Sequence, residues 1–214
     1  MPTERFYRLP EEKKEVIRKA ALKEFTRVVP EEASINKVIH DADISRGSFY
    51  TYFDSKYDLL KWLFSDKVKK YQYFYVNDLK ENGGNIWLTF EKALEASMNH
   101  AFDGGFIGII ENLMESKTFP ELFKQELEAE DDSEICCSRR TYLEGIYQLL
   151  NRERYPMDYI MFSDLMEMHL IVIMLSFKRI LKDKEPVDKV QRFYSRRMEL
   201  LRFGAETRNM NQNN

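Results

Sequence analysis

Between Ser45 and Thr51 the chain places polar and amphipathic side chains around a narrow apolar stripe. Phe49 and Phe53 are four residues apart, so on a helix they share one side and can anchor it. The opposite side carries Arg46, Ser48, Tyr50, Thr51 and Tyr52. Guanidinium, hydroxyl and phenol groups bond to base edges and phosphates. A helix of about two turns with this division predicts insertion into a DNA major groove.

Each polar group has its own expected contact. We expect Arg46 to pair with guanine O6 and N7, and Ser48 and Thr51 to touch base edges, Thr51 through a thymine methyl group. Tyr50 and Tyr52 are expected to donate their hydroxyls to phosphates. The alternative is a plainer role, on a solvated helix face or in packing.

These side chains need a preceding helix and a turn to position them. Ser34 is a natural N-cap, followed at helical spacing by Ile35, Val38, Ile39 and Ala42. Residues 42–44 suffice only for a turn, in which Ile44 can fill the gap between helices, and Ser45 caps again. The succession predicts a helix-turn-helix motif.

Flanking helices complete this region. Residues 10–28 form an amphipathic helix that Pro30 ends, and the capping box at 55–58 opens a long helix that runs to the Asn-Gly-Gly breaker at 82–84. Lys56, at the start of that long helix, is expected to bind a phosphate. Lys37 and Ser34 are weaker candidates for backbone contacts.

The composition favours an all-α protein. Only 8 Gly and 6 Pro interrupt 214 residues that are 43% hydrophobic. No strand is expected, and further helices are predicted over residues 86–102, 106–116, 119–128, 134–152, 158–182 and 186–203.

Charge is divided unevenly along the chain. Residues 1–70 hold 15 Lys and Arg against 12 Asp and Glu, whereas residues 71–214 hold 18 against 24. A slightly basic head and an acidic body have the polarity that DNA binding requires. The charged N-terminus does not read as a signal peptide, and the most apolar stretch, 165–177, contains Glu167 and His169. We therefore expect a cytoplasmic protein with no membrane segment.

Residues for catalysis or metal binding are sparse. Cys136 and Cys137 are adjacent, which suits neither an ordinary disulfide nor a closed zinc site; two helix residues are the plain interpretation and a thiol sensor the alternative. His40, His100 and His169 are far apart, without a nucleophile elbow or phosphate loop. We expect no enzyme activity, metal or cofactor.

The body is rich in soft and amphipathic side chains, which suit an adaptable pocket for a small hydrophobic or aromatic ligand. Individually most of them are expected in the core. The candidate pocket residues are Tyr71, Tyr75, Trp87, Met98, Phe102, Phe106, Met114, Tyr142, Tyr147, Met161 and Met168.

The last two helices predict a dimer. The first is apolar almost all round and the second carries a stripe at spacings of three and four, so two such helices from each subunit would form a four-helix interface. The expected interface residues are Leu165, Met166, Leu170, Ile173, Phe177, Val190, Phe193, Tyr194, Met198 and Leu201.

Taken in order, residues 9–64 resemble the DNA-binding domain of the TetR family of bacterial repressors. The residues at family-typical places are Ser45, Gly47, Phe49, Tyr50, Tyr52, Phe53, Lys56 and Leu59. One departure is Asp43, where the family usually has glycine in the turn. Aspartate tolerates the left-handed conformation better than most residues, so we expect the turn to form.

The resemblance implies a ligand-responsive repressor. The helix-turn-helix domain, residues 1–54, would bind a palindromic operator in double-stranded DNA, and the helical domain, 55–208, would hold a small-molecule inducer and form the homodimer. Residues 209–214 have no apolar residue except Met210 and are expected to be a disordered tail. The alternative is a helical ligand-binding or scaffold protein without DNA-binding activity.

Overall fold

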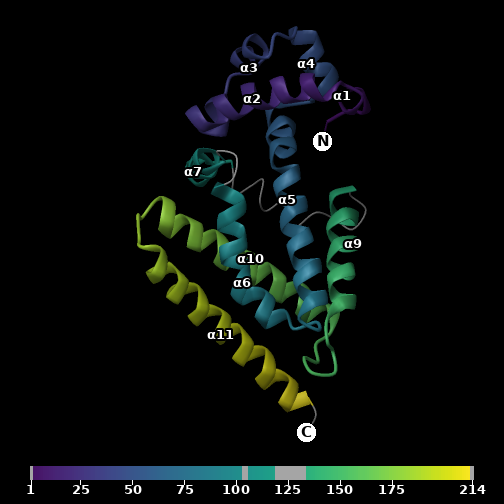
Figure 1. The fold of residues 1–214 in the computed structure, drawn as a ribbon, viewed down its shortest axis with the longest axis vertical. Helices are drawn as coiled ribbons and strands as arrows, with labels where there is room; N and C mark the ends of the chain where they lie inside the picture. Colours follow the sequence, from purple (N-terminus) through teal and green to yellow (C-terminus); the bar gives the residue numbers. More distant parts are fainter. Residues whose placement is uncertain (1, 103–105, 119–133, 213–214) are drawn as a thin grey trace. The chain divides into compact units, whose positions relative to one another are not determined.

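The computed structural model describes residues 2–102, 106–118 and 134–212. All regular elements in these residues are helices, which confirms the predicted all-α fold (Figure 1). Contacts group the chain into two compact units. The N-terminal unit comprises residues 1–70 and 101–127, and the C-terminal unit comprises 71–100 and 128–214. The sequence predicts domains that meet after residue 54; the contacts also group 55–70 with the N-terminal helices.

The helices that precede α5 (Lys56–Glu81) are short, except for α2. They are α1 (Glu4–Tyr7), α2 (Glu11–Arg27), the 3-10 helix η1 (Pro30–Glu32), α3 (Ile35–Asp41) and α4 (Arg46–Tyr52). The predicted helix over 10–28 and the helix-turn-helix are confirmed within a residue or two. Helix α1 was not predicted from the sequence, because four residues carry no periodic pattern.

Longer helices follow: α5 (Lys56–Glu81), α6 (Ile86–Phe102), α7 (Ile107–Glu115), α9 (Glu134–Leu149), α10 (Tyr159–Leu181) and α11 (Val187–Gln212). The helix predicted over 119–128 lies outside the described residues. Helix α11 continues past residue 203, its expected end, and includes residues 209–212 of the predicted tail. No proline or glycine interrupts residues 205–212, so nothing in the sequence stops the helix there.

The end of α5 is fixed by glycine, as the sequence predicts. Gly83 and Gly84 have φ angles of 69° and 77°, in the left-handed region that favours glycine. The Gly84 amide donates to the Leu79 carbonyl at 2.8 Å, and its carbonyl accepts from Asn151 at 3.0 Å. A Cβ at Gly84 would collide with the backbone of Leu149, so this turn also joins α5 to the end of α9.

Aromatic rings dominate the core of the N-terminal unit. Phe6 lies 4.7 Å from both Phe53 and Trp62, measured between ring centroids, and Phe49 lies 5.5 Å from Phe53. Ile17, Phe25, Val38, Leu59 and Leu63 complete the core. The first turns of α5 are therefore anchored in the same core as α4.

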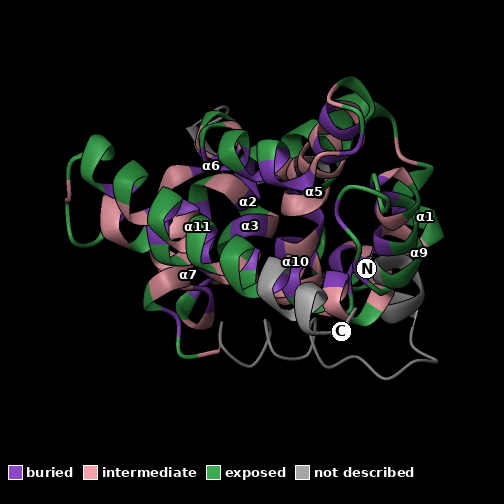
Figure 2. Ribbon diagram, turned by 90° about the horizontal axis from the view of Figure 1, so that it is seen from below, coloured by how far each residue is buried: buried purple, intermediate pink, exposed green. Residues whose placement is uncertain are grey.

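In the C-terminal unit α10 packs against α9 and α11. Buried and exposed residues alternate along the helices, as amphipathic packing requires (Figure 2). Helix α10 is long and apolar enough to cross a bilayer by length and composition, and a core helix passes the same test. Its buried residues include the polar His169 and Ser176, which fits the core.

Candidate DNA interface

Helix α4 is held by its apolar side and capped at its start. Phe49 and Phe53 are buried, and the Ser45 hydroxyl accepts a hydrogen bond from the Ser48 amide at 3.0 Å. Asp43 has a φ angle of 48°, so the aspartate adopts the left-handed turn conformation expected of it. The turn before α4 and the start of the helix are therefore set by features that the sequence carries locally.

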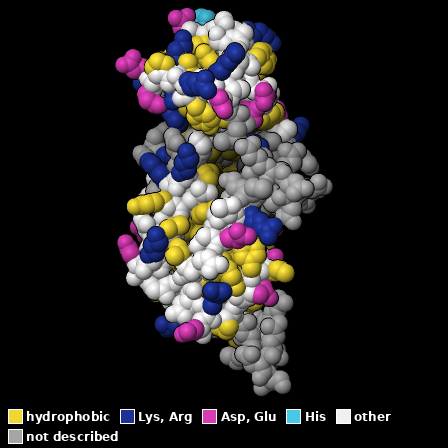
Figure 3. All heavy atoms as spheres, turned by 90° about the vertical axis from the view of Figure 1, so that its right-hand side faces the viewer, with side chains coloured by type: hydrophobic (Ala, Val, Ile, Leu, Met, Phe, Trp, Pro, Cys, Tyr) yellow, Lys and Arg dark blue, Asp and Glu magenta, His cyan; other side chains and the backbone are white. Residues whose placement is uncertain are grey.

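The opposite side of α4 faces solvent. Arg46 is exposed and donates to Asn36 Oδ1 at 3.0 Å, and 46% of Tyr50 is exposed. Thr51 donates to the Gly47 carbonyl at 2.9 Å. On the N-terminal helices drawn in Figure 3, basic side chains are interspersed with acidic ones. The surface offers individual donors rather than a uniform positive field.

Gly47 lies on this surface without a structural need for glycine. A Cβ there would meet only the Ser45 hydroxyl, at 3.7 Å, which is ordinary contact. The residue is exposed in the first turn of α4. Because glycine has no side chain, the space that it leaves lies on the outer surface of α4 and not in the core.

The last turn of α4 is tied to the N-terminus, which sequence reasoning missed. Thr3 donates its hydroxyl to the Thr51 carbonyl at 2.7 Å and its amide to the Tyr52 carbonyl at 3.0 Å. Phe6 then packs edge-on against Tyr52 with centroids 6.0 Å apart. Tyr52 is partly buried and so has both a packing role and a phenol near the surface.

Lys56 is engaged within the protein. Its ammonium group donates to the carbonyls of Glu31 and Ala33, at 2.5 Å and 3.3 Å. These bonds connect the start of α5 to the segment that precedes α3. A phosphate contact by Lys56 stays a prediction, and it would have to be shared with this bridging role.

The cap at the start of α3 comes from a residue of the preceding long helix, α2. Ser34, the expected N-cap residue, makes no side-chain capping bond; its amide donates to Glu24 Oε1 at 2.8 Å. A bidentate bond from Arg27, at 2.7 and 2.9 Å, lowers the pKa of Glu24. Lys37 is exposed on the same helix.

Hydrogen bonds join α7 to the end of α2 and to the segment that follows it. The Asn112 amide donates to the carbonyls of Phe25 and Thr26, at 2.8 and 2.9 Å. Glu31 accepts from Ser116 Oγ and the Thr118 amide, both at 2.7 Å. Burial opposes ionisation, yet these bonds lower the pKa of Glu31 to about 2.

In the C-terminal unit a buried polar chain occupies the core. The Tyr75 hydroxyl lies 2.7 Å from Tyr71 Oη and 2.9 Å from His169 Nδ1, and His169 Nε2 lies 2.7 Å from Tyr194 Oη. Tyr194 donates onward to the Phe90 carbonyl. Burial lowers the pKa of His169 to about 3, so the imidazole is neutral. It is a core histidine with both ring nitrogens hydrogen-bonded.

The expected pocket residues are spread over both units. Phe106 and Met114 belong to the N-terminal unit, and the side chain of Phe102 lies outside those that the structure describes. Tyr75 and Trp87 are buried, whereas Met168 is exposed. Tyr71, Met98, Tyr142, Tyr147 and Met161 are half-buried. The buried Tyr142 hydroxyl has no hydrogen-bond partner within the described part of the chain.

Most of the expected dimer residues pack inside the single chain. Leu165, Ile173, Phe177, Val190, Tyr194 and Met198 are buried, while Met166, Leu170, Phe193 and Leu201 are partly exposed. The buried six lie in the core of the C-terminal unit, where α10 packs against α9 and α11, and their role in a dimer stays a prediction. The exposed apolar side chains of these helices are Ile160, Met168, Leu175, Val187, Leu200 and Phe203.

No group of three metal-ligating side chains occurs among the residues that the structure describes. The side chains of Cys136 and Cys137 lie outside that part of the structure.

Comparison with known proteins agrees with the geometry. The family model "Bacterial regulatory proteins, tetR family" matches residues 17–63, and no curated protein matches the chain. A tetR-family transcriptional regulator from Streptomyces coelicolor has a similar structure, with a TM-score of 0.50 and 15% identity over 93% of this chain and 84% of that one. A TetR family transcriptional regulator from Chloroflexus aurantiacus J-10-FL is 20% identical over 90% and 97%, with a TM-score of 0.44.

The Streptomyces structure supports the fold, and the family model covers the helix-turn-helix described above. Residues 17–63 are thus the segment that matches the tetR family of bacterial regulatory proteins, and this segment contains α3 and α4.

Proposed function

We propose that this DNA-binding regulator acts as a repressor that holds a palindromic operator as a homodimer. The observation that carries the proposal is the division of α4: two buried phenylalanines fix the helix, while Arg46 and Tyr50 are exposed and Thr51 is half-buried. Gly47 supports the same reading, because an exposed glycine allows the DNA backbone to approach closely.

The partner surface is assigned to the exposed apolar residues of α10 and α11. Ile160, Met168 and Leu175 are separated by eight and seven residues, so they share one side of α10. Leu200 and Phe203 on α11 are 66% and 71% exposed. Apolar surface of this kind is typical of protein–protein contacts. Paired subunits would set two α4 helices about 34–36 Å apart, as successive major grooves require.

Sedimentation velocity at micromolar concentration tests the dimer. We expect a dimer for the wild type and a monomer for the double variant Leu200→Lys, Phe203→Lys, with Tyr73→Lys, at another exposed aromatic residue, as the control. A monomeric wild type would contradict the assignment.

Release is assigned to a small hydrophobic or aromatic ligand in the C-terminal unit. The buried Tyr142 hydroxyl has no hydrogen-bond partner among the described residues, and the Tyr71–Tyr75–His169 chain adds further polar groups to the core of this unit. A ligand can shift DNA affinity only if it binds the DNA-free state more tightly. Thermal-shift screening of neutral aromatic compounds tests this; a Tyr142→Phe variant should lose affinity for any ligand that bonds to the hydroxyl.

Fluorescence anisotropy with the promoter of its own gene tests DNA binding. We expect Arg46→Ala to reduce discrimination between operator and scrambled DNA by about 1–3 kcal/mol. Lys56→Ala should weaken binding to all DNA and reduce the salt slope by about one. Arg192→Ala on α11 is the control. Unchanged discrimination for Arg46→Ala would remove that residue from the interface.

A further inference from the structure

The Arg46 guanidinium has one neighbour on each helix of the helix-turn-helix. Its Nη1 donates to Asn36 Oδ1, in the first turn of α3, at 3.0 Å, and both residues are exposed. The guanidinium carbon also lies 5.7 Å from the centroid of the Tyr50 ring, one turn further along α4. An amide acceptor and an aromatic ring restrict a side chain that is otherwise flexible. The group that we expect to read guanine is therefore held in place in the DNA-free chain.

The bond between Asn36 and Arg46 decides which of their atoms remain for DNA. A guanidinium only donates, so Asn36 presents its amide oxygen to Arg46 and its Nδ2 points elsewhere. On Arg46, Nε and Nη2 lie along an edge that does not include Nη1, and neither atom has a partner among the described residues. Two parallel N–H groups on one edge are what guanine O6 and N7 accept. The bond therefore leaves the base-reading edge of Arg46 intact.

The other two predicted base-reading side chains of α4 are engaged within the helix itself. Ser48 Oγ lies 2.9 Å from Ser45 Oγ, and the Thr51 hydroxyl donates to the Gly47 carbonyl at 2.9 Å. Thr51 keeps its methyl group for a thymine, but its hydroxyl proton is used. Arg46 therefore has the most donors to offer a base, and the preference of α4 depends on where this side chain is held.

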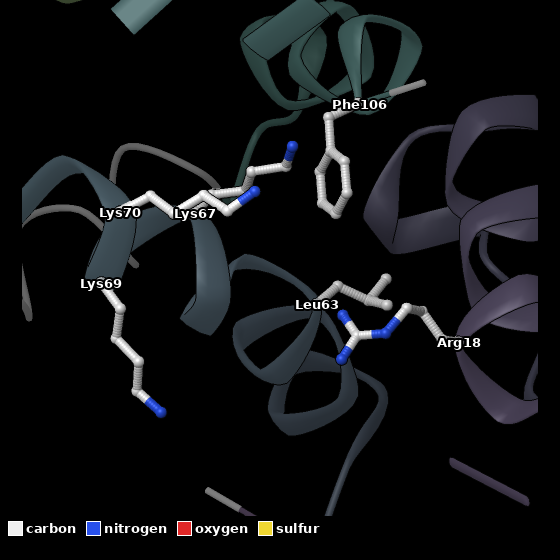
Figure 4. Close-up of a pocket in the computed structure, with 6 residues that line it drawn as sticks. All are labelled: Arg18, Leu63, Lys67, Lys69, Lys70 and Phe106. Carbon is white, nitrogen blue, oxygen red and sulfur yellow. The ribbon is translucent and has the colours of Figure 1, made fainter. Parts of the chain in front are cut away.

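The nearest parallel within the N-terminal unit is Arg18. Its guanidinium carbon lies 4.4 Å from the centroid of the Trp62 ring, and its Nε lies 3.5 Å from the Glu15 carboxylate. Figure 4 shows Arg18 at a hollow whose other lining residues are Leu63, Lys67, Lys69, Lys70 and Phe106. A ring and an oxygen atom thus hold both Arg18 and Arg46, but the oxygen beside Arg18 belongs to a charged group.

The charge of Arg46 is not cancelled by its partner. Arg8, Arg18 and Arg27 each pair with a glutamate three or four residues before them. Asn36 is neutral, and no carboxylate forms an ion pair with Arg46 among the residues that the structure describes. Because a positive charge strengthens bonds to guanine O6 and N7 and attracts phosphates, Asn36 holds Arg46 without weakening its attraction to DNA.

We propose that Asn36 determines sequence specificity at the DNA interface by positioning Arg46 against a guanine. The inference rests on the proposed function, since it names the residue of α3 through which α4 reads its base. Ser34 and Lys37 are the candidates that the sequence gives near the start of this helix. Asn36 was missed because its bond joins residues ten positions apart, on two helices.

The order of the Arg46 side chain in the DNA-free chain tests the positioning. The heteronuclear NOE of its Nε–H reports motion on the picosecond-to-nanosecond timescale. We expect a clearly higher NOE in the wild type than in Asn36→Ala. Gln148→Ala removes an exposed side-chain amide from α9 and is the matched control, which should leave the NOE unchanged. An Nε–H that is as mobile in the wild type as in Asn36→Ala would overturn the proposal.

Selection of bound sequences from a random duplex pool tests the reading role. The position at which Arg46→Ala loses preference identifies the base that Arg46 reads. Asn36→Ala should lose preference at the same position, by about threefold to tenfold, because one hydrogen bond no longer holds the guanidinium. Its salt slope should equal that of the wild type, since no charge is removed. In the double variant, discrimination should equal that of Arg46→Ala alone, because Asn36 acts through Arg46.

Lys37→Ala, the next residue of α3, is the contrasting variant. It removes a charge, so it should reduce the salt slope by about one and keep the preference at the position that Arg46 reads. A reduced slope in Asn36→Ala as well would assign Asn36 to the phosphate backbone and overturn the proposal.

Two further results would contradict the role of Asn36. Loss of preference at a different position from that of Arg46→Ala, or additive losses in the double variant, would mean that Asn36 reads a base itself. If the wild type and Asn36→Ala enrich the same sequence equally, only the role of Asn36 is contradicted. A wild type that enriches no sequence contradicts the proposed function, and the reading role of Asn36 with it.

Discussion

The cores of the two units of this protein contain different kinds of side chain. The N-terminal unit buries phenylalanine and tryptophan rings and places two carboxylates, Glu24 and Glu31, at helix junctions, where N–H and hydroxyl groups donate to Glu24 and to Glu31 Oε1. The C-terminal unit buries neutral phenols and an imidazole in a continuous polar chain. The first arrangement holds α4 in one geometry, and in the second the phenols and the imidazole bond to one another inside the core.

The units can be followed separately because each contains one of the two tryptophans. Trp62 lies in the N-terminal unit and Trp87 in the C-terminal unit, and both are buried. A Trp87→Phe variant reports unfolding of the N-terminal unit by fluorescence, and a Trp62→Phe variant reports the other.

The largest expected effect is on the aromatic core. Phe49→Ala should destabilise the N-terminal unit by about 3–5 kcal/mol, because it leaves a cavity among fully buried rings. Urea unfolding of the Trp87→Phe background measures this, and Tyr50→Ala, on the exposed side of the same helix, should cost less than about 1 kcal/mol. An equal loss in the Trp62→Phe background would mean that the units do not unfold separately.

Acidification should weaken the C-terminal unit first. His169 has a folded pKa of about 3 against 6.5 in the unfolded chain, so below pH 6.5 the unfolded state binds the extra proton and stability falls as pH falls. From pH 7 to 5 the expected loss is about 2 kcal/mol. Urea midpoints in the Trp62→Phe background measure it, and His169→Gln should remove most of the dependence.

The N-terminal unit has a different acid window. The folded pKa of Glu31 is about 2 against 4.5 unfolded, so its contribution is complete above pH 4.5 and is lost as pH falls toward 2. Between pH 7 and 5 the Trp87→Phe background should therefore change little. A loss of about 2 kcal/mol there would contradict the contrast between the units.

The smallest effect is expected at the cap of α4. Ser45→Ala removes the bond to the Ser48 amide and should cost about 1 kcal/mol. Ser34→Ala is the comparison, since the Ser34 side chain makes no capping bond and α3 takes its cap from Glu24. Thermal unfolding in the Trp87→Phe background compares the two; equal losses would mean that the side-chain bond at Ser45 adds nothing.

The features that could be predicted from the sequence are those whose interacting residues lie close together along the chain. The caps at Ser45 and Asp158, the left-handed Asp43 and the glycine stop of α5 depend on neighbours within a few residues. The bond of Glu24 to the Ser34 amide and the bonds of Glu31 to Ser116 and Thr118 join residues distant in sequence. The apolar stripes on α10 and α11 could be recognised in the sequence. Periodicity, however, does not show whether the same chain or a partner subunit covers them.

In the function that we propose, α4 reads DNA as part of a symmetric dimer. Selection of bound sequences from a random duplex pool by the wild-type chain tests it most directly, with Arg46→Ala selected in parallel. We expect an inverted repeat whose half-site centres are about 10 base pairs, or a multiple of that, apart, and loss of preference at one position per half-site for the variant. Enrichment of no sequence, or of the same sequence by both proteins, would contradict the account.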